Sequence, residues 1–251
     1  MTTVLLRLSG PLQSYGTTSR WEERDTLPRP TKSAVLGLLA NALGPGQSPS
    51  RFAGLVFAVR CDRPGHLEED VQTAGGGHFG RPTAQAAAGG VMPTDSWYGA
   101  PRYPSTAPLA PSPASWKPAD RGTVMMTKQY IVDASFLVGL SGCTPQQADR
   151  ITTALAQPYG LLYLGRRSCP PSQPIYYDTT EDEADVWPQR VPLVTEATTS
   201  TPQVWAQGLP GPGAHTFPEQ SAAPSDRPRY QLLHVHQYRV TPPPTPAEST
   251  P

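Results

Sequence analysis

The chain has 251 residues, a length that fits one large domain or one medium domain with a small second one. Its hydrophobic fraction of 37% is low for a globular protein, because 32 prolines and 22 glycines replace apolar residues, yet too high for a chain disordered throughout. Twenty basic and twenty acidic residues give a formal net charge of zero. This excludes binding to nucleic acid or to an anionic membrane through overall positive charge, but not a local cationic site.

The first predicted elements are a strand, a helix and a second strand. Val4–Leu8 predicts a buried strand that ends at Ser9-Gly10-Pro11. After a polar loop, Thr31 is a good N-cap, and apolar residues recur at helical spacing until Gly44-Pro45. Residues 55–61 (LVFAVRC) are rich in β-branched and aromatic side chains and predict the second strand.

A long excursion follows the second strand. Residues 72–122 contain two glycine clusters, an alanine run and eight prolines, and this composition precludes a regular core. We expect either a hairpin that docks on another molecule or a partly ordered loop.

Order returns with a third strand, a second helix and a fourth strand. Tyr130–Leu140 is apolar almost throughout and therefore predicts a central strand. Thr144 opens a capping box with proline at the first helical position, and this helix ends before Pro158. Residues 161–164 (LLYL) predict the fourth strand. The resulting β-α-β, β-α-β order predicts an α+β fold of the ferredoxin-like type, the topology of RNA-recognition modules.

The C-terminal part has few apolar residues. Strand candidates lie at 190–195 and 232–240, and we expect a small sheet that leans on the first domain. The predicted organisation is a ferredoxin-like domain at 1–174 with its insertion, a small β region at 175–240, and a flexible proline-rich tail at 241–251.

Several classes of protein are not supported by the sequence. The cysteines Cys61, Cys143 and Cys169 are odd in number and far apart, and the pair His234 and His236 lacks a third ligand, so we expect neither disulfides nor a metal or other cofactor. No signal peptide is recognisable, and no apolar stretch approaches the roughly 18 residues of a membrane span. We therefore expect a cytoplasmic protein without a membrane partner.

Two basic clusters are candidate phosphate sites. Lys32 and Ser33 open the first helix, where free N–H groups and the helix dipole attract anions; the alternative is a solvated lysine beside an ordinary cap. Arg166 and Arg167 follow a glycine and a predicted strand, a setting that suits bidentate phosphate binding or stacking on bases. The alternative there is an exposed, solvated pair.

The loop after the first strand is a candidate base-reading site. Gln13, Ser14 and Tyr15, with Arg20, combine an amide, a hydroxyl, an aromatic ring and a guanidinium. Such groups can bind a single-stranded base at its edge and by stacking, although similar mixtures occur in many loops.

Five segments in the same order carry a family resemblance. They are LRLSGPLQSYG (6–16), RPTKSAVLGLLA (29–40), FAVRCD (57–62), YIVDASF (130–136) and YLGRRSCP (163–170). These segments resemble the CasD family, the RAMP-type subunits of type I-E CRISPR Cascade complexes. The resemblance implies a noncatalytic antiviral-defence protein that binds and caps the 5′ handle of the CRISPR RNA (crRNA). It also implies a modified RNA-recognition fold with a protruding thumb and contacts to the backbone subunit CasC and the large subunit CasA.

The 72–122 excursion falls where the thumb belongs. Its large aromatic side chains are better explained as anchors for a partner than as incidental residues, because aromatic residues dominate interfaces. These candidate partner-binding residues are Phe79, Trp97, Tyr98, Tyr103 and Trp116. The alternative function is a ribonuclease that processes precursor crRNA, as related proteins do with a tyrosine, lysine and histidine cluster. Lys128 near Tyr130 would fit, but no histidine adjoins them.

Overall fold

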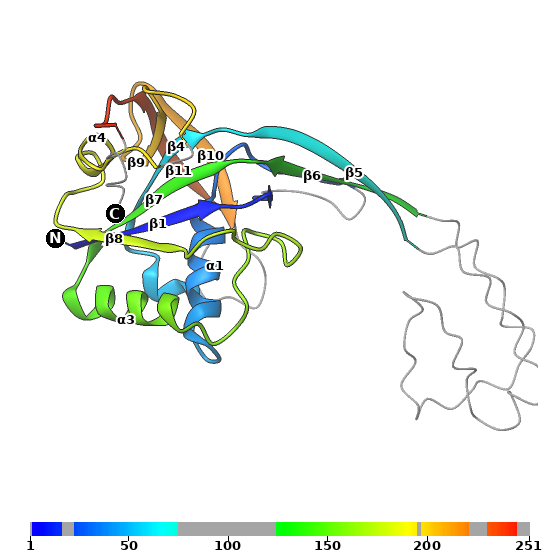
Figure 1. Cartoon of the computed structure of the whole chain (residues 1–251), viewed down its shortest axis with the longest axis horizontal. Helices are drawn as coiled ribbons and strands as arrows, with labels where there is room; N and C mark the ends of the chain where they lie inside the picture. Colours follow the sequence, from blue (N-terminus) through cyan, green and yellow to red (C-terminus); the bar gives the residue numbers. More distant parts are fainter. Residues whose placement is uncertain (1, 17–22, 75–123, 195–196, 221–229, 245–251) are drawn as a thin grey trace, which may run out of the picture. The chain divides into compact units, whose positions relative to one another are not determined.

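The computed structural model in Figure 1 describes residues 2–16, 23–74, 124–194, 197–220 and 230–244. The chain forms two compact units. The first comprises residues 1–19, 25–69 and 129–251, and the second comprises residues 20–24 and 70–128.

A seven-stranded antiparallel sheet forms the centre of the first unit. Its strands are β1 (Thr2–Ser9), β4 (Val56–Arg63), β7 (Ser135–Cys143), β8 (Tyr176–Thr180), β9 (Gln203–Gln207), β10 (Ala214–Gln220) and β11 (Tyr230–Arg239). They lie in the order β10-β11-β9-β4-β7-β1-β8. The mixed α/β class and the antiparallel arrangement agree with the predicted α+β class.

Two helices cover one face of this sheet (Figure 1), α1 (Lys32–Leu43) and α3 (Pro145–Ala156). Both begin where the sequence predicts. The Thr31 side chain accepts a hydrogen bond from the N–H of Ala34 at 3.3 Å, and Thr144 forms a complete capping box with Gln147. Shorter helical turns lie at η1 (Pro49–Phe52) and α4 (Trp187–Arg190).

The central strands are buried on both faces, which explains their nearly continuous apolar sequences. Val4, Leu6 and Leu8 of β1 belong to the core beneath the helices. Leu5 points to the opposite face, where Trp187 is fully buried. A Cβ atom at Gly139 would lie 2.4 Å from Nε1 of Trp187, so glycine at this position of β7 leaves the space for the indole.

A second sheet contains β2 (Leu12–Gln13), β3 (Glu23–Arg24), β5 (His66–Ala74) and β6 (Val124–Val132). β6 pairs with all three of the others. The predicted single strand at Tyr130–Leu140 is wrong, because the chain turns at Asp133 (φ 58°) between β6 and β7. Buried apolar residues lie close to Asp133 on both sides, Ile131 before it and Ala134 after it, so hydropathy does not mark the break. Aspartate tolerates this left-handed conformation better than most residues.

Two other strand predictions differ from the structure. Residues 161–164 form no strand, and Leu161 is 91% exposed; the place beside β1 belongs instead to the more polar β8. The stretch predicted as a strand at 190–195 begins with the end of α4 and continues as coil through 194. The C-terminal strands β9, β10 and β11 extend the main sheet rather than forming a separate small one.

A buried ion pair fixes the segment after α4 to the sheet. Arg60 and Asp62 both lie on β4 with side chains 0% exposed, and Nε of Arg60 is 2.7 Å from Oδ1 of Asp62. The Arg60 guanidinium also donates to the carbonyls of Pro188, Val191 and Pro192 at 2.6–3.0 Å. These carbonyls therefore accept hydrogen bonds from the arginine instead of pairing with a neighbouring strand.

The described residues contain no helix long and apolar enough to cross a membrane. Cys61, Cys143 and Cys169 are buried free thiols. Within the same residues, no three His, Cys, Asp or Glu side chains are grouped as a metal ion would require.

Candidate functional site

The paired arginines lie in a tight loop, residues 164–169, which we call the arginine loop. The loop closes on itself because the N–H of Leu164 donates to the carbonyl of Cys169 at 2.7 Å and the N–H of Cys169 donates to the carbonyl of Arg166 at 2.9 Å. Leu164 and Cys169, its two ends, are fully buried. Only the turn between them reaches the surface.

Gly165 brings the arginine loop against the backbone after β2. Its φ of 88° lies in the left-handed region, and a Cβ atom there would lie 1.7 Å from the carbonyl oxygen of Ser14. The N–H of Ser14 donates to the carbonyl of Leu164 at 3.1 Å. Glycine is therefore required at this position for two reasons, the left-handed backbone conformation and the close approach to the backbone of Ser14.

Arg166 is half-buried, and contacts to other described residues orient its side chain. Its Nη1 donates to the carbonyl of Gln129 at 3.0 Å, and Nη2 lies 3.5 Å from the carbonyl of Asp25. The guanidinium carbon stacks 4.8 Å from the ring centroid of Tyr130. Arg166 thus holds the loop in place as well as contributing positive charge.

Arg167 is exposed and makes no hydrogen bond or ion pair to any described residue. A guanidinium presented on a fixed loop can grip a phosphate in a bidentate manner. The pair therefore divides its roles: Arg166 positions the loop, and Arg167 faces solvent.

The predicted base-reading residues Gln13, Ser14 and Tyr15 are buried, which contradicts their direct role. The Gln13 amide donates to the carbonyls of Leu8 (3.2 Å) and Ala134 (2.8 Å) and accepts from the Tyr15 hydroxyl at 2.7 Å. The Ser14 hydroxyl donates to the carbonyl of Gln129 at 3.3 Å. Burial, and secondarily Cys169, raises the pKa of Tyr15 well above its usual value. These side chains support the arginine loop from beneath.

Lys32 is also buried, so the predicted phosphate contact at the start of α1 is wrong. Its ammonium donates to the carbonyls of Ala53 (2.7 Å) and Leu55 (2.6 Å) and to Oε1 of Gln207 (3.0 Å). All three protons are therefore used within the protein. Ser33 is half-buried, and its hydroxyl lies 3.3 Å from that of Thr31.

The remaining predicted site residues fall outside the described part of the chain. These are Arg20, Phe79, Trp97, Tyr98, Tyr103 and Trp116. Sequence reasoning did not single out Tyr130 as the stacking partner of Arg166, although an aromatic residue on a predicted strand was a usable signal. It also missed the Arg60–Asp62 pair, where alternate positions on a strand place two opposite charges on one face.

Comparison with known proteins gives consistent matches. Residues 3–239 match the family described as CRISPR-associated protein (Cas_Cas5). The Cascade subunit CasD of Escherichia coli (strain K12) is 27% identical over 186 residues, 71% of this chain and 71% of that protein.

Solved structures agree. A crystal structure of a Cas protein is 28% identical with a TM-score of 0.67, covering 98% of this chain and 100% of that one. A chain of a CRISPR RNA-guided surveillance complex is 29% identical with a TM-score of 0.66, covering 96% and 91%. The resemblance to CasD is thereby confirmed, and the chain belongs to the Cas5 family of CRISPR-associated proteins.

Proposed function

We propose that this protein is a noncatalytic RNA-binding subunit of a Cascade-type surveillance complex and that it binds the 5′ handle of the crRNA. The observation that carries the proposal is the arginine loop, which presents Arg167 to solvent on a backbone fixed by Gly165, in a family of CRISPR-associated proteins. Phosphate contacts dominate the affinity of proteins for nucleic acid, and a fixed arginine is well suited to make one.

The topology of the core supports the proposal that the protein binds RNA. Strands β8, β1, β7 and β4 are adjacent in that order, and with α1 and α3 they form a ferredoxin-like arrangement in this proposal. RNA-recognition modules stack bases on an open sheet face. Here that face is covered, since Leu5, Ala58 and Leu137 are fully buried with Trp187. This favours RNA binding at the arginine loop rather than across the central strands.

Arg167→Ala should weaken RNA binding roughly tenfold, because a hydrogen-bonded charge pair contributes about 1.5 kcal/mol or more. The slope of log affinity against log salt should fall in magnitude by about 0.7, the value for one phosphate contact on a single strand. The melting temperature of the protein should not change, since an exposed arginine contributes little to stability. Fluorescence anisotropy with a labelled handle RNA at several salt concentrations measures both quantities.

Arg51→Ala is the matched control, because it removes one exposed positive charge outside the arginine loop. If the two variants bind RNA equally well, Arg167 has no role in the site. The double variant Arg166→Ala with Arg167→Ala should lose more, since Arg166 also positions the loop through Gln129 and Tyr130.

The purified protein should leave precursor crRNA intact, with or without divalent metal. Tyr130 is 7% exposed beneath Arg166, and the Lys128 ammonium donates to the Gln72 amide, so both candidate groups are already engaged. A gel assay of precursor RNA tests this. Cleavage that disappears in Lys128→Ala would favour the ribonuclease alternative.

The expected protein partners are CasC and CasA, by analogy with the Cascade subunit to which the chain is similar. The aromatic residues proposed as thumb anchors lie outside the described residues.

A further inference from the structure

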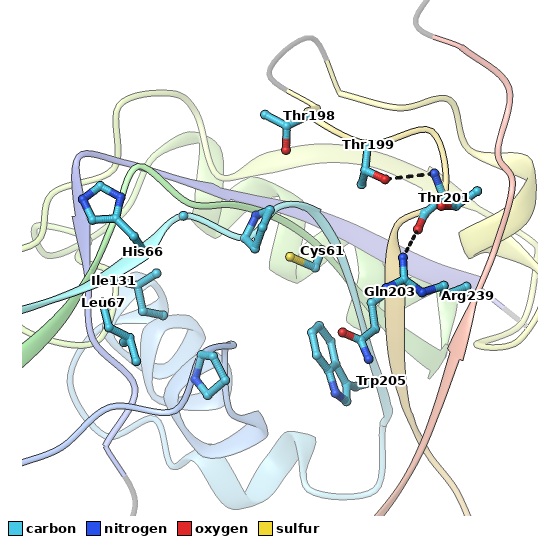
Figure 2. A pocket seen from close by; sticks show the side chains of 13 residues that line it. Cys61, His66, Leu67, Ile131, Thr198, Thr199, Thr201, Gln203, Trp205 and Arg239 are labelled. Atoms are coloured by element: carbon cyan, nitrogen blue, oxygen red, sulfur yellow. Dashed lines mark hydrogen bonds between the residues drawn. The ribbon is translucent and has the colours of Figure 1, made fainter.

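A cavity of about 400 Å³ lies in the first unit, and none of the residues that line it is one of the proposed RNA contacts (Figure 2). Its wall combines segments far apart in the sequence: Pro28, strands β4 and β5 with the turn between them, β6, the loop 198–201, and strands β9 and β11. Most of the lining residues belong to no recognisable sequence motif, and they come together only in the folded protein.

The body of the cavity is apolar. Trp205 lines one side, Ile131 and Leu67 lie across from it in Figure 2, and Cys61 lies above Trp205 in that view. Burial, and secondarily the neighbouring Asp62, raises the pKa of Cys61 to about 12, so the thiol presents a neutral wall. The guanidinium carbon of buried Arg29 lies 6.0 Å from the centroid of the Trp205 ring and 4.7 Å from that of Phe217.

The rim of the cavity is cationic and held in place. Exposed Arg239 donates through Nη1 to the carbonyl of Thr201 at 3.1 Å, and the N–H of Thr201 donates to the Thr199 hydroxyl at 3.2 Å (Figure 2). The N–H of Thr198 donates to the carbonyl of Asp62 at 3.0 Å, which ties this loop to β4. None of the thirteen described residues that line the cavity is aspartate or glutamate.

The cavity is separate from the arginine loop. Tyr130 lies under Arg166, whereas its neighbour Ile131 lines the cavity. Successive residues of a strand point to opposite faces, so the two features lie on opposite sides of β6. A ligand in the cavity would therefore add a second contact rather than extend the first.

We infer that this cavity accepts one unstacked nucleobase of a bound RNA, with the base beside Trp205 and an adjoining phosphate facing Arg239. The volume lies at the small end of ligand pockets and suits one nucleotide. A flat aromatic wall with threonine hydroxyls nearby matches how proteins bind single-stranded bases. An apolar side chain of a partner protein would use the same walls but would leave the cationic rim unexplained. The inference rests on the proposed function, because it presupposes RNA as the ligand.

The test fills the cavity without touching the arginine loop. Thr198→Trp places a large ring at a lining position whose side chain is exposed, and Ser200→Trp places the same ring at an exposed position of the same loop that does not line the cavity. With a labelled handle RNA, Thr198→Trp should weaken binding roughly tenfold, the effect of losing one stacked base. Ser200→Trp should bind as the original protein does. Arg239→Gln should weaken binding several-fold and reduce the salt slope.

Abasic RNAs identify the base. An abasic nucleotide at one position should weaken binding to the original protein but not weaken it further in Thr198→Trp. Equal RNA binding by Thr198→Trp and Ser200→Trp would overturn the inference. If Thr198→Trp binds RNA normally but fails to copurify with other subunits, the cavity instead binds a side chain of a partner protein. Absence of RNA binding by the original protein would instead refute the proposed function.

Discussion

Gly165→Ala should destabilise the protein by several kcal/mol and abolish RNA binding at the arginine loop. The added Cβ atom would lie 1.7 Å from the carbonyl oxygen of Ser14, a backbone atom that no side-chain rotation can move. Alanine is also disfavoured at a φ of 88°. The loop must therefore separate from Ser14, which breaks the hydrogen bond to Leu164 and releases Arg166 from Tyr130. Urea unfolding and RNA anisotropy measure the two effects.

Gly142→Ala is a matched control for this substitution. Gly142 has nearly the same φ, 89°, but a Cβ atom there would meet nothing within 4 Å. It should therefore show only the conformational cost, about 1–2 kcal/mol, and bind RNA normally. If the two variants unfold at the same urea concentration, the close approach of Gly165 to Ser14 does not hold the loop.

Asp62→Ala should lower the free energy of unfolding by about 3–5 kcal/mol, because it leaves the buried Arg60 charge without its carboxylate. For a chain of this size, each kcal/mol shifts the melting temperature by about 2–4 °C, so calorimetry should record a fall on the order of 10 °C. The hydrogen bond from the N–H of Val194 to Oδ2 of Asp62 (3.4 Å) is also lost, which loosens the segment after α4.

Arg190→Ala provides the comparison with an exposed ion pair. Nη1 of Arg190 lies 2.8 Å from Oδ1 of Asp182, yet its side chain is 69% exposed, so its loss should cost less than about 1 kcal/mol. A melting temperature for Asp62→Ala close to that of Arg190→Ala would mean that the buried pair does not fix the segment to the sheet.

The sequence predicted the elements whose signals are local. Thr31 and Thr144 marked the starts of both long helices, since capping depends on residues within one turn. The turn at Asp133 escaped prediction because two buried strands flank it with continuous apolar residues. β8 (YYDTT) escaped because a polar edge strand lacks hydrophobic alternation.

In the candidate site, too, features with a local sequence signal differ from features that depend on distant residues. The arginine pair stands out in the sequence as a candidate because glycine and two arginines are adjacent in the chain. Whether a polar residue faces solvent depends on partners from other parts of the chain. The ammonium of Lys32 donates hydrogen bonds to residues 53, 55 and 207. The amide of Gln13 forms hydrogen bonds with residues 8, 15 and 134. The cavity beside Trp205 draws on still more distant segments, and no local pattern marks it.

Footprinting of an assembled complex shows whether this protein covers the 5′ handle of the crRNA. The tagged protein is coexpressed with the other Cascade subunits and a crRNA, the complex is purified, and the RNA is probed with a single-strand-specific nuclease. We expect the protein to copurify with the complex and the 5′ end of the RNA to be protected. In the double variant Arg166→Ala with Arg167→Ala, the same end should become accessible while the rest of the RNA stays protected. An unprotected 5′ end with the original protein would mean that it does not bind the handle, and equal protection in the folded double variant would mean that the arginine loop is not the binding site.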